Sequence, residues 1–167
     1  MKVGIIMGSK SDLETMTKAA QVLDDFSIPY EMVIASAHRT PGAVKAYVER
    51  LTAEGAIAFI AGAGAAAHLP GVVASYTSRP VIGVPLNATG LNGMDALLAI
   101  VQMPSGMPVA TMALDGAKNA ALLAVQMAGL VDTALYERYQ AFRADQAAKV
   151  EADNAQLQEQ LQEQLQA

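Results

Sequence analysis

Short apolar runs alternate with longer segments of helical periodicity along most of the chain. Runs rich in β-favouring residues predict five strands, at residues 3–7, 30–34, 57–61, 81–84 and 109–112. The segments between them predict a helix that follows residues 8–12 and ends near residue 26, helices at 41–54, 91–101 and 118–127, and a shorter one after residues 62–68. Continuous apolar strands are typical of parallel sheets buried on both faces. The pattern therefore predicts a three-layer α/β fold built from parallel βαβ units.

The chain after Leu130 is rich in Ala and Gln and has a different pattern. Leu135, Tyr139 and Phe142 recur at spacings of four and three, which predicts a helix that packs through this stripe. Residues 156–167 form a low-complexity repeat with Leu157, Leu161 and Leu165 at every fourth position, too short for the sustained heptads of a coiled coil. We expect one domain over residues 1–150, including the packing helix, and a Gln-rich helical tail over 151–167 that frays or faces another subunit.

The composition adds an expectation about assembly. The chain has 167 residues, of which 53% are hydrophobic and only 16% are charged, whereas a soluble domain usually has about 25% charged residues. We therefore expect a homo-oligomer with extensive apolar interfaces. Four of the 16 acidic residues lie after residue 150, so residues 1–150 hold 12 acidic and 11 basic residues. This balance does not provide the basic surface that nucleic-acid binding requires.

Two apolar segments raise the question of a membrane location. Residues 55–78 contain no charged side chain and exceed the roughly 20 residues of a membrane span, but Gly, Pro and His residues interrupt them. We expect a buried strand, a loop and a helix there instead. The apolar start of the chain is too short for a signal peptide. These features predict a cytoplasmic protein without a membrane span.

The chain has no cysteine and two histidines. Disulfides, thiolate metal sites and a cysteine nucleophile are therefore excluded, and little remains for a histidine-based metal centre. The unusual polar and small residues instead follow the predicted strands, at residues 8–12, 36–41, 62–68 and 87–93. Ligands of open parallel sheets bind beyond the carboxyl ends of the strands. We expect these four loops to form one site.

The first loop contains Ser9, Ser11 and Asp12 at a junction between a strand and a helix. Backbone N–H groups at a helix start and two hydroxyls suit a phosphate, whereas a carboxylate suits a ribose diol. Alternatively, a serine caps the helix and Asp12 interacts with its dipole. The loop has neither the GxGxxG nor the GxxxxGK[ST] spacing, so neither a dinucleotide nor ATP is indicated.

The second loop places His38 beside Arg39, with Ser36 and Thr40 around them. An imidazole suits proton transfer near neutral pH, and a guanidinium suits a phosphate or carboxylate. The alternative is a loop histidine bonded to backbone beside a surface ion pair. In the third loop, Gly and Ala residues would let backbone approach a flat ligand near His68, or they would serve close helix packing with His68 as a capping donor.

Five motifs stand in order along the chain: Met7-Gly8-Ser9-Lys10-Ser11-Asp12, Ser36-Ala37-His38-Arg39-Thr40-Pro41, Gly62 to Gly64 with Ala66-Ala67-His68-Leu69-Pro70-Gly71, Pro80-Val81-Ile82-Gly83-Val84-Pro85, and Ile100-Val101-Gln102-Met103-Pro104. Together they resemble the N5-carboxyaminoimidazole ribonucleotide mutases, the PurE family of purine biosynthesis, over residues 2–129. The resemblance implies a flavodoxin-like five-stranded parallel sheet of order 2-1-3-4-5, an octamer and no metal or organic cofactor. The implied reaction, an isomerisation, moves a carboxylate from the exocyclic N5 to ring carbon C4 of an aminoimidazole ribonucleotide.

The resemblance also implies roles for individual residues. His38 would be the general acid and base, and Asp12 would bind the ribose. The loop from Gly64 to Leu69, with His68, would surround the base and the transient CO2. The phosphate would be bound by Ser9, Ser11, Ser36 and Arg39. Ala65 stands where the family commonly has another glycine, and residues 86–90 also depart from its usual pattern, so we expect a narrower pocket near the base.

Two other functions compete with this interpretation. A related carboxylase would add dissolved CO2 to aminoimidazole ribonucleotide with the same fold and histidine, although His68-Leu69-Pro70-Gly71 resembles the mutases more closely. A non-catalytic flavodoxin-like binding module is the second. Asp12 stands alone where a receiver domain needs an acidic cluster, and three Phe, five Tyr and no Trp offer few aromatic walls for a flavin.

Overall fold

The computed structural model describes the backbone of residues 1–166 and the side chains of residues 1–164. Ala167 and the side chain of Leu165, both in the expected tail, lie outside the described residues. Five parallel strands form one sheet of order β2-β1-β3-β4-β5, as the resemblance implied. The strands are β1 (Lys2–Met7), β2 (Tyr30–Ile34), β3 (Ala56–Gly64), β4 (Val81–Leu86) and β5 (Ala110–Thr111).

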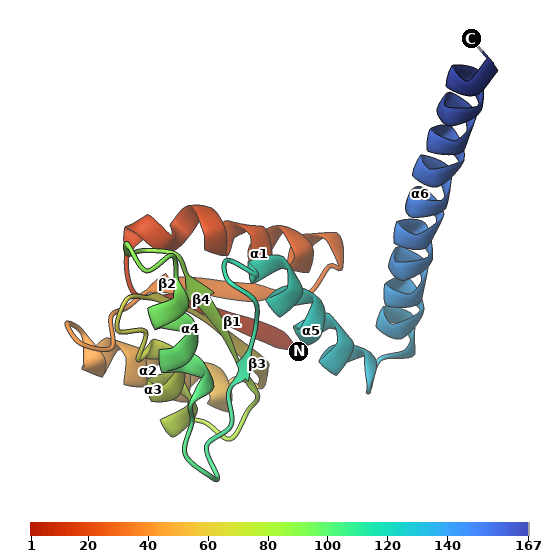
Figure 1. Cartoon of the computed structure of the whole chain (residues 1–167). Coiled ribbons are helices and arrows are strands. Elements are labelled where there is room, and N and C mark those ends of the chain that lie inside the picture. The colour runs from red at the N-terminus through yellow and green to blue at the C-terminus, as the bar shows by residue number, and fades with distance from the viewer. Residues whose placement is uncertain (167) are drawn as a thin grey trace.

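Helices cover both faces of this sheet (Figure 1). They are a 3-10 turn η1 (Lys10–Asp12), α1 (Leu13–Asp25), α2 (Pro41–Ala53), α3 (Leu69–Ser75), α4 (Met94–Val101), α5 (Ala117–Gly129) and α6 (Thr133–Gln166). One buried cluster joins the sheet to α1 and α5, and another joins it to α2, α3 and α4. The predicted three-layer α/β sandwich is confirmed.

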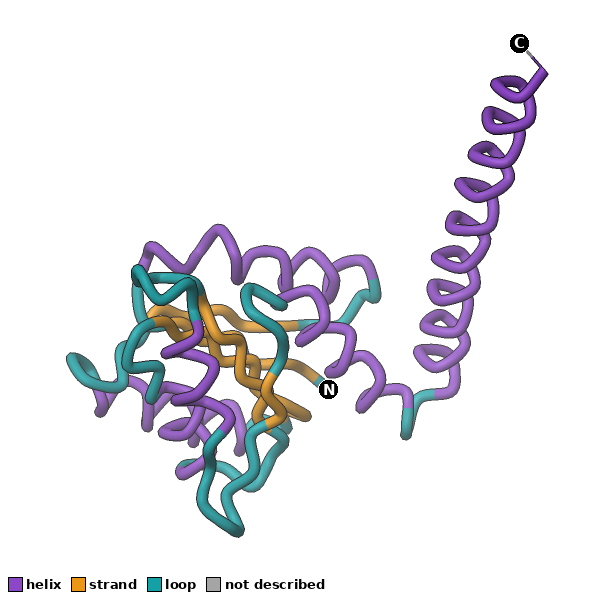
Figure 2. Tube along the Cα trace, in the orientation of Figure 1, coloured by secondary structure: helices purple, strands orange, loops and turns teal. Residues whose placement is uncertain are grey.

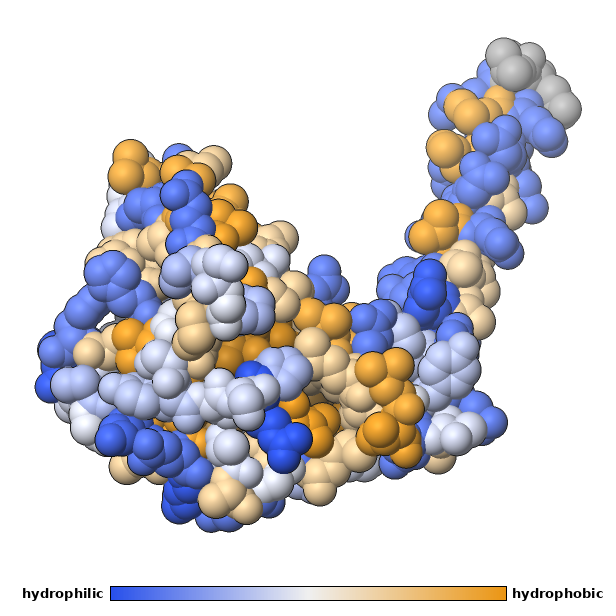
Figure 3. All heavy atoms as spheres, turned by 90° about the horizontal axis from the view of Figure 1, so that it is seen from below, coloured by the Kyte–Doolittle hydropathy of each residue, from blue (hydrophilic) through white to orange (hydrophobic). Residues whose placement is uncertain are grey.

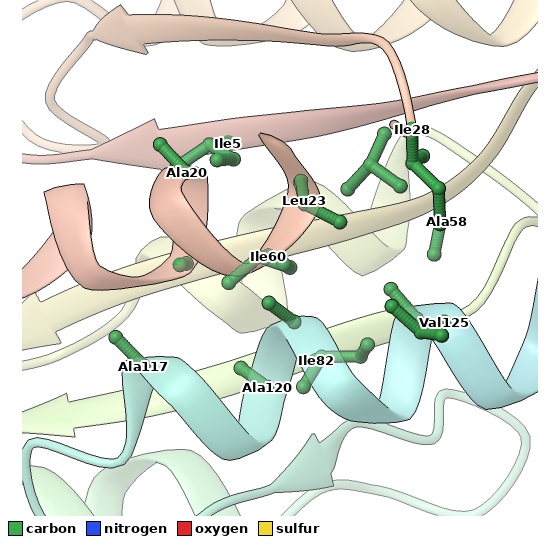
Figure 4. Close-up of a cluster of buried hydrophobic side chains, with 14 of the residues drawn as sticks. Ile5, Ala20, Leu23, Ile28, Ala58, Ile60, Ile82, Ala117, Ala120 and Val125 are labelled. Carbon is green, nitrogen blue, oxygen red and sulfur yellow. The ribbon is translucent and has the colours of Figure 1, made fainter. Parts of the chain in front are cut away.

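The first cluster is built from aliphatic side chains on both sides of the interface (Figure 4). Ile5, Ile60 and Ile82, from three neighbouring strands, are fully buried and face alanines of α1 and α5. Small helix residues let these helices approach the sheet closely, and burying each large aliphatic side chain contributes roughly 1.5–3 kcal/mol. This packing fixes the strands whose carboxyl ends carry the predicted loops.

The third strand is longer than predicted. Residues 62–64, expected in a loop, continue β3 and pair with Val84, Pro85 and Leu86 of β4. Their small side chains have a packing reason, because a Cβ atom at Gly62 would lie 2.4 Å from the sulfur of Met16 on α1. A Cβ atom at Gly64 would lie 2.5 Å from the Cβ of Ala88. The expectation of a loop was wrong because strand propensity does not report such close approaches.

The helix predicted at 91–101 begins later, at Met94. Asn92 and Gly93 have positive φ angles of 52° and 81°, so the chain turns there before the helix starts. The last strand is also shorter than the predicted 109–112. The chain after this strand remains bonded to β4, because Asp115 N–H donates to the Pro85 carbonyl at 2.9 Å.

The last helix begins against the body and then leaves it (Figure 1). Leu135 is buried in the first cluster, with Tyr139 and Phe142 packed against it, so the predicted packing stripe is confirmed. The helix continues without a break past residue 150, where the tail was expected to start. Its distal part is mainly hydrophilic with isolated apolar groups (Figure 3). None of the described helices is both long and apolar enough to cross a membrane.

Candidate active site

The loops that follow β1, β2 and β3 meet beyond the carboxyl ends of these strands, where Figure 2 draws them in teal. They line a cavity of about 370 Å³, which also includes Ala88 from the loop after β4. All nine residues predicted for the site line it: Ser9, Ser11, Asp12, Ser36, His38, Arg39, Gly64, His68 and Leu69. A larger cavity of about 780 Å³, beside Arg79 and the start of β4, contains none of them. The smaller cavity is therefore the candidate active site.

The loop after β1 is held by a capping box. Ser9 N–H donates to Asp12 Oδ2 at 3.0 Å, and Ser9 Oγ accepts a longer bond from Ser11 N–H at 3.4 Å. Ser11 Oγ also donates to Asp12 Oδ1 at 3.1 Å. The capping alternative considered from the sequence is thus present. Each carboxylate oxygen has two lone pairs, so these bonds leave Asp12 able to accept from a ligand as well.

The loop after β2 is connected to the first loop through Arg39. Its Nη2 donates to the Gly8 carbonyl at 3.1 Å, and its backbone N–H donates to Ser36 Oγ at 3.2 Å. Ser36 N–H donates to Thr40 Oγ1 at 2.8 Å, which closes the turn before α2. The Ser36 hydroxyl accepts here, so its own hydrogen stays available to a ligand. Pro41 then starts α2, where its missing N–H costs no helical hydrogen bond.

The two histidines of the chain contact each other across the cavity. His38 Nε2 lies 2.7 Å from His68 Nδ1, and the rings meet edge to face with their centroids 4.9 Å apart. His68 precedes α3 but makes no capping bond with its side chain. The capping alternative for His68 is therefore wrong, because its ring is turned towards His38 instead.

The backbone between β3 and α3 is unusual for its sequence. Ala65 and Ala67 have φ angles of 53° and 42°, in the left-handed region that glycine adopts most easily. This conformation costs a residue with a Cβ atom about 1–2 kcal/mol. The cost is concentrated in the segment that carries His68 and lines the cavity.

Several lining residues carried no chemical signal in the sequence. Ala37, Ala63 and Ala88 lie in the loops expected to form the site and line the cavity, but they were given no individual role because a methyl group indicates no particular chemistry. The loop after β4 is held beside them by Thr89, whose Oγ1 donates to Asp95 Oδ2 at 2.9 Å. Among the residues with described side chains, no three His, Asp or Glu residues gather closely enough to hold a metal ion.

Comparison with known proteins identifies the family. A family model described as AIR carboxylase matches residues 2–149. The chain belongs to this family. The N5-carboxyaminoimidazole ribonucleotide mutase of Pyrococcus horikoshii is 52% identical over 157 residues, covering 94% of this chain and 89% of the relative. The resemblance stated from the sequence motifs is confirmed.

Two further similar proteins extend the comparison. The phosphoribosylaminoimidazole carboxylase of Saccharomyces cerevisiae is 51% identical over 148 residues, which cover 89% of this chain but 26% of that longer protein. The crystal structure of Treponema denticola PurE is 31% identical, with a TM-score of 0.86 over 93% of this chain and 97% of that one. The flavodoxin-like arrangement of this chain is therefore shared with a solved PurE structure.

Proposed function

We propose that the chain converts N5-carboxyaminoimidazole ribonucleotide to 4-carboxy-5-aminoimidazole ribonucleotide in purine biosynthesis, as a mutase that moves one carboxylate within its substrate. The observation that carries this proposal is the 52% identity with the Pyrococcus horikoshii mutase over 94% of this chain. The cavity supports it, since an imidazole pair, a guanidinium and several hydroxyls line one space of suitable chemistry for a nucleotide.

The proposed reaction balances with one proton. When the bond between N5 and the carboxylate breaks, CO2 leaves and N5 takes up a proton. When CO2 forms its bond to C4, that carbon loses its proton. We assign both transfers to His38, which gives a proton at N5 and takes one back from C4, because imidazole is the side chain whose ordinary pKa is closest to neutrality.

The phosphate and ribose are bound at the other side of the cavity in this proposal. Arg39 uses two of its five N–H donors on Gly8 O and, at 3.5 Å, on Ser36 Oγ, and the remaining donors suit a phosphate. Ser9 and Ser36 add hydroxyl donors, and Ser11 does so when its hydroxyl turns from Asp12 to the phosphate. Asp12 accepts from the ribose hydroxyls. These contacts hold the nucleotide while leaving the imidazole ring of the substrate near His38.

The CO2 released in the first step needs an apolar space. Gly64, Ala65, Ala67, Leu69 and Ala88 line the cavity with small or aliphatic groups. Such a wall offers no nucleophile that could react with CO2. We propose that this wall retains CO2 until it reaches C4, which is what separates a mutase from an enzyme that uses dissolved CO2.

The substrate assay tests the proposal directly. The purified protein is supplied either with N5-carboxyaminoimidazole ribonucleotide or with aminoimidazole ribonucleotide and bicarbonate, and the C4-carboxylated product is measured. We expect rapid product from the first substrate. Rapid product from the second substrate alone would replace the mutase by the carboxylase.

The carboxylase is the second candidate function, and a specific observation favours it. The family model is described as AIR carboxylase, and the Saccharomyces cerevisiae relative is a carboxylase at 51% identity. Both activities would use the same bound nucleotide and the same histidine. The source of the CO2 is therefore the property that the assay must distinguish.

A homo-oligomer, and specifically the octamer implied by the resemblance, is part of this proposal. Leu91, Met94, Leu98 and Val101 form an apolar stripe on and just before α4, and their exposed fractions are 65%, 51%, 49% and 50%. A contiguous apolar stripe of this kind is typical of an interface. We propose that a second copy of the chain covers it. A cytoplasmic location is also proposed, in line with the role of the family in purine biosynthesis.

A further inference from the structure

The short distance between the two histidines limits the number of protons that the pair can hold while the rings stay in contact. A separation of 2.7 Å between His38 Nε2 and His68 Nδ1 is a short hydrogen-bond distance, and a hydrogen bond needs one donor and one acceptor. Only one hydrogen therefore fits between the two rings. The joined pair can be neutral or carry one positive charge, whereas a doubly charged pair would have hydrogens on both facing nitrogens and would have to separate.

The contact is supported by the backbone that carries His68. Ala65 and Ala67 adopt left-handed φ angles on either side of Ala66, directly before His68. Strained residues of this kind are held by surrounding structure and cluster at functional sites. His38 is placed independently, by the turn between Ser36 and Thr40. Two separate loops therefore bring the rings together.

We propose that His68 is a positioning residue for proton transfer, and that the hydrogen-bonded pair of His38 and His68, not His38 alone, gains and loses the catalytic proton. This inference rests on the proposed function and deepens it. The pair with one positive charge donates a proton to N5 and becomes neutral. The neutral pair then removes the proton from C4 and regains its charge.

The pair has one charged neighbour in the loop after β1 and one in the loop that carries His38 itself. Asp12 follows β1 and Arg39 is next to His38, and they are the only other ionisable side chains lining the cavity within the described residues. Arg39 adds a positive charge to the site and Asp12 a negative one, so they oppose each other in their effect on the charge of the pair. A pH titration of the two rings therefore reports mainly on the interaction between them.

The chain offers an unusually direct test, since these are its only histidines. Protein labelled with 15N-histidine gives signals from these two rings alone, which are followed by NMR across pH 4 to 9. In the wild type we expect both rings to respond in the same two separated steps, as interacting groups do. His68→Asn keeps an amide near the position of Nδ1 but cannot take a proton, so His38 should then titrate in one step.

A kinetic arm connects the titration to turnover. His68→Asn should lower kcat about tenfold to a hundredfold and change its pH profile, with KM within about threefold of the wild type. His68→Gln, whose amide reaches the position of Nε2 instead, serves as the second variant if His68→Asn does not fold. The inference is overturned if the His38 titration curve is the same in the wild type and in the variant. The NMR arm needs no turnover, so failure of the proposed function would be seen separately, as absence of product with the wild type.

Discussion

At the scale of single residues, neighbours in the sequence have different contacts in the site. Arg39 bonds to Gly8 of the first loop, whereas His38 contacts His68 of the third. The sequence indicated an acid-base group beside an anion-binding group, but it could not show that the two side chains interact with separate loops. This division makes the effects of substituting each residue distinguishable.

Replacing His38 should remove turnover and keep binding. His38→Asn retains a polar group able to bond to His68 but cannot exchange a proton at neutral pH. General acid-base catalysis contributes about 10²–10⁴ in rate, so we expect kcat to fall by about that factor. Binding of the C4-carboxylated product, measured by calorimetry, should change little. Near-normal kcat would remove His38 from the proposed role.

Replacing Arg39 should act mainly on binding. Loss of a hydrogen bond to a charged group costs about 1.5–3 kcal/mol, which corresponds to roughly a ten- to hundredfold rise in KM. Arg39→Ala is measured by steady-state kinetics beside Arg39→Lys, which keeps the charge without the planar fork and should lie in between. An unchanged KM in the alanine variant would contradict phosphate binding by Arg39.

At the scale of elements, the apolar pattern located all five strands, while details depended on contacts between elements. The pattern ended β3 at residue 61 because glycine is uncommon in strands, but Gly62 and Gly64 are required by Met16 and Ala88. The left-handed conformation of Ala65 had no signal in the residue itself, since Ala normally indicates a helix, although the family's glycine at this position fits it. The strand order came from the family resemblance, because an apolar run does not state which strands are neighbours.

Tyr47 connects α2 to the sheet and predicts a pH effect on stability. Its hydroxyl donates to the Glu31 carbonyl at 2.6 Å and lies 3.2 Å from the Ile5 carbonyl. Burial raises the pKa of the Tyr47 phenol well above its ordinary value of about 10, and the Glu31 carboxylate acts in the same direction. Because the pKa is higher in the folded state, this contribution to stability is present below pH 10 and is lost as the pH rises above it.

The corresponding experiment compares unfolding of the wild type and Tyr47→Phe by thermal denaturation between pH 7 and 11. At pH 7 the variant should lose about 1 kcal/mol through the missing hydrogen bond. The difference in stability between the wild type and the variant should narrow above pH 10. The wild type then loses the contribution of the Tyr47 phenol, whereas phenylalanine has no proton to lose. A gap that stays constant to pH 11 would show that the Tyr47 phenol does not contribute to alkaline unfolding.

At the scale of the whole molecule, low charge in the sequence and an apolar stripe in the structure lead to the same proposal. The sequence indicated apolar interfaces without locating them, because the overall composition does not say where on the surface the apolar residues lie. The stripe on and before α4 locates one candidate. The distal part of α6, which leaves the body, exposes Val150, Leu157 and Leu161 among mainly hydrophilic neighbours (Figure 3).

A charge on this stripe should disrupt the assembly. Leu98→Glu puts a carboxylate where a second copy is proposed to bind, and an unpaired buried charge is strongly unfavourable. Light scattering after gel filtration should show an octamer for the wild type and smaller species for the variant. Gln21→Glu, an exposed position on α1, adds the same charge elsewhere and should leave the octamer intact. Equal masses for the wild type and Leu98→Glu would contradict an interface at α4.

In the proposed reaction, the carboxylate moves within one bound nucleotide. This transfer is tested most directly with N5-carboxyaminoimidazole ribonucleotide carrying 13C in its carboxylate, in a buffer with excess unlabelled bicarbonate and carbonic anhydrase. Mass spectrometry then measures the label in the product after a single turnover. We predict that most of the product retains 13C at its C4 carboxylate, because the apolar wall is proposed to retain CO2 until it reaches C4. Product that carries mainly unlabelled carboxylate would contradict the mutase and identify dissolved CO2 as the substrate.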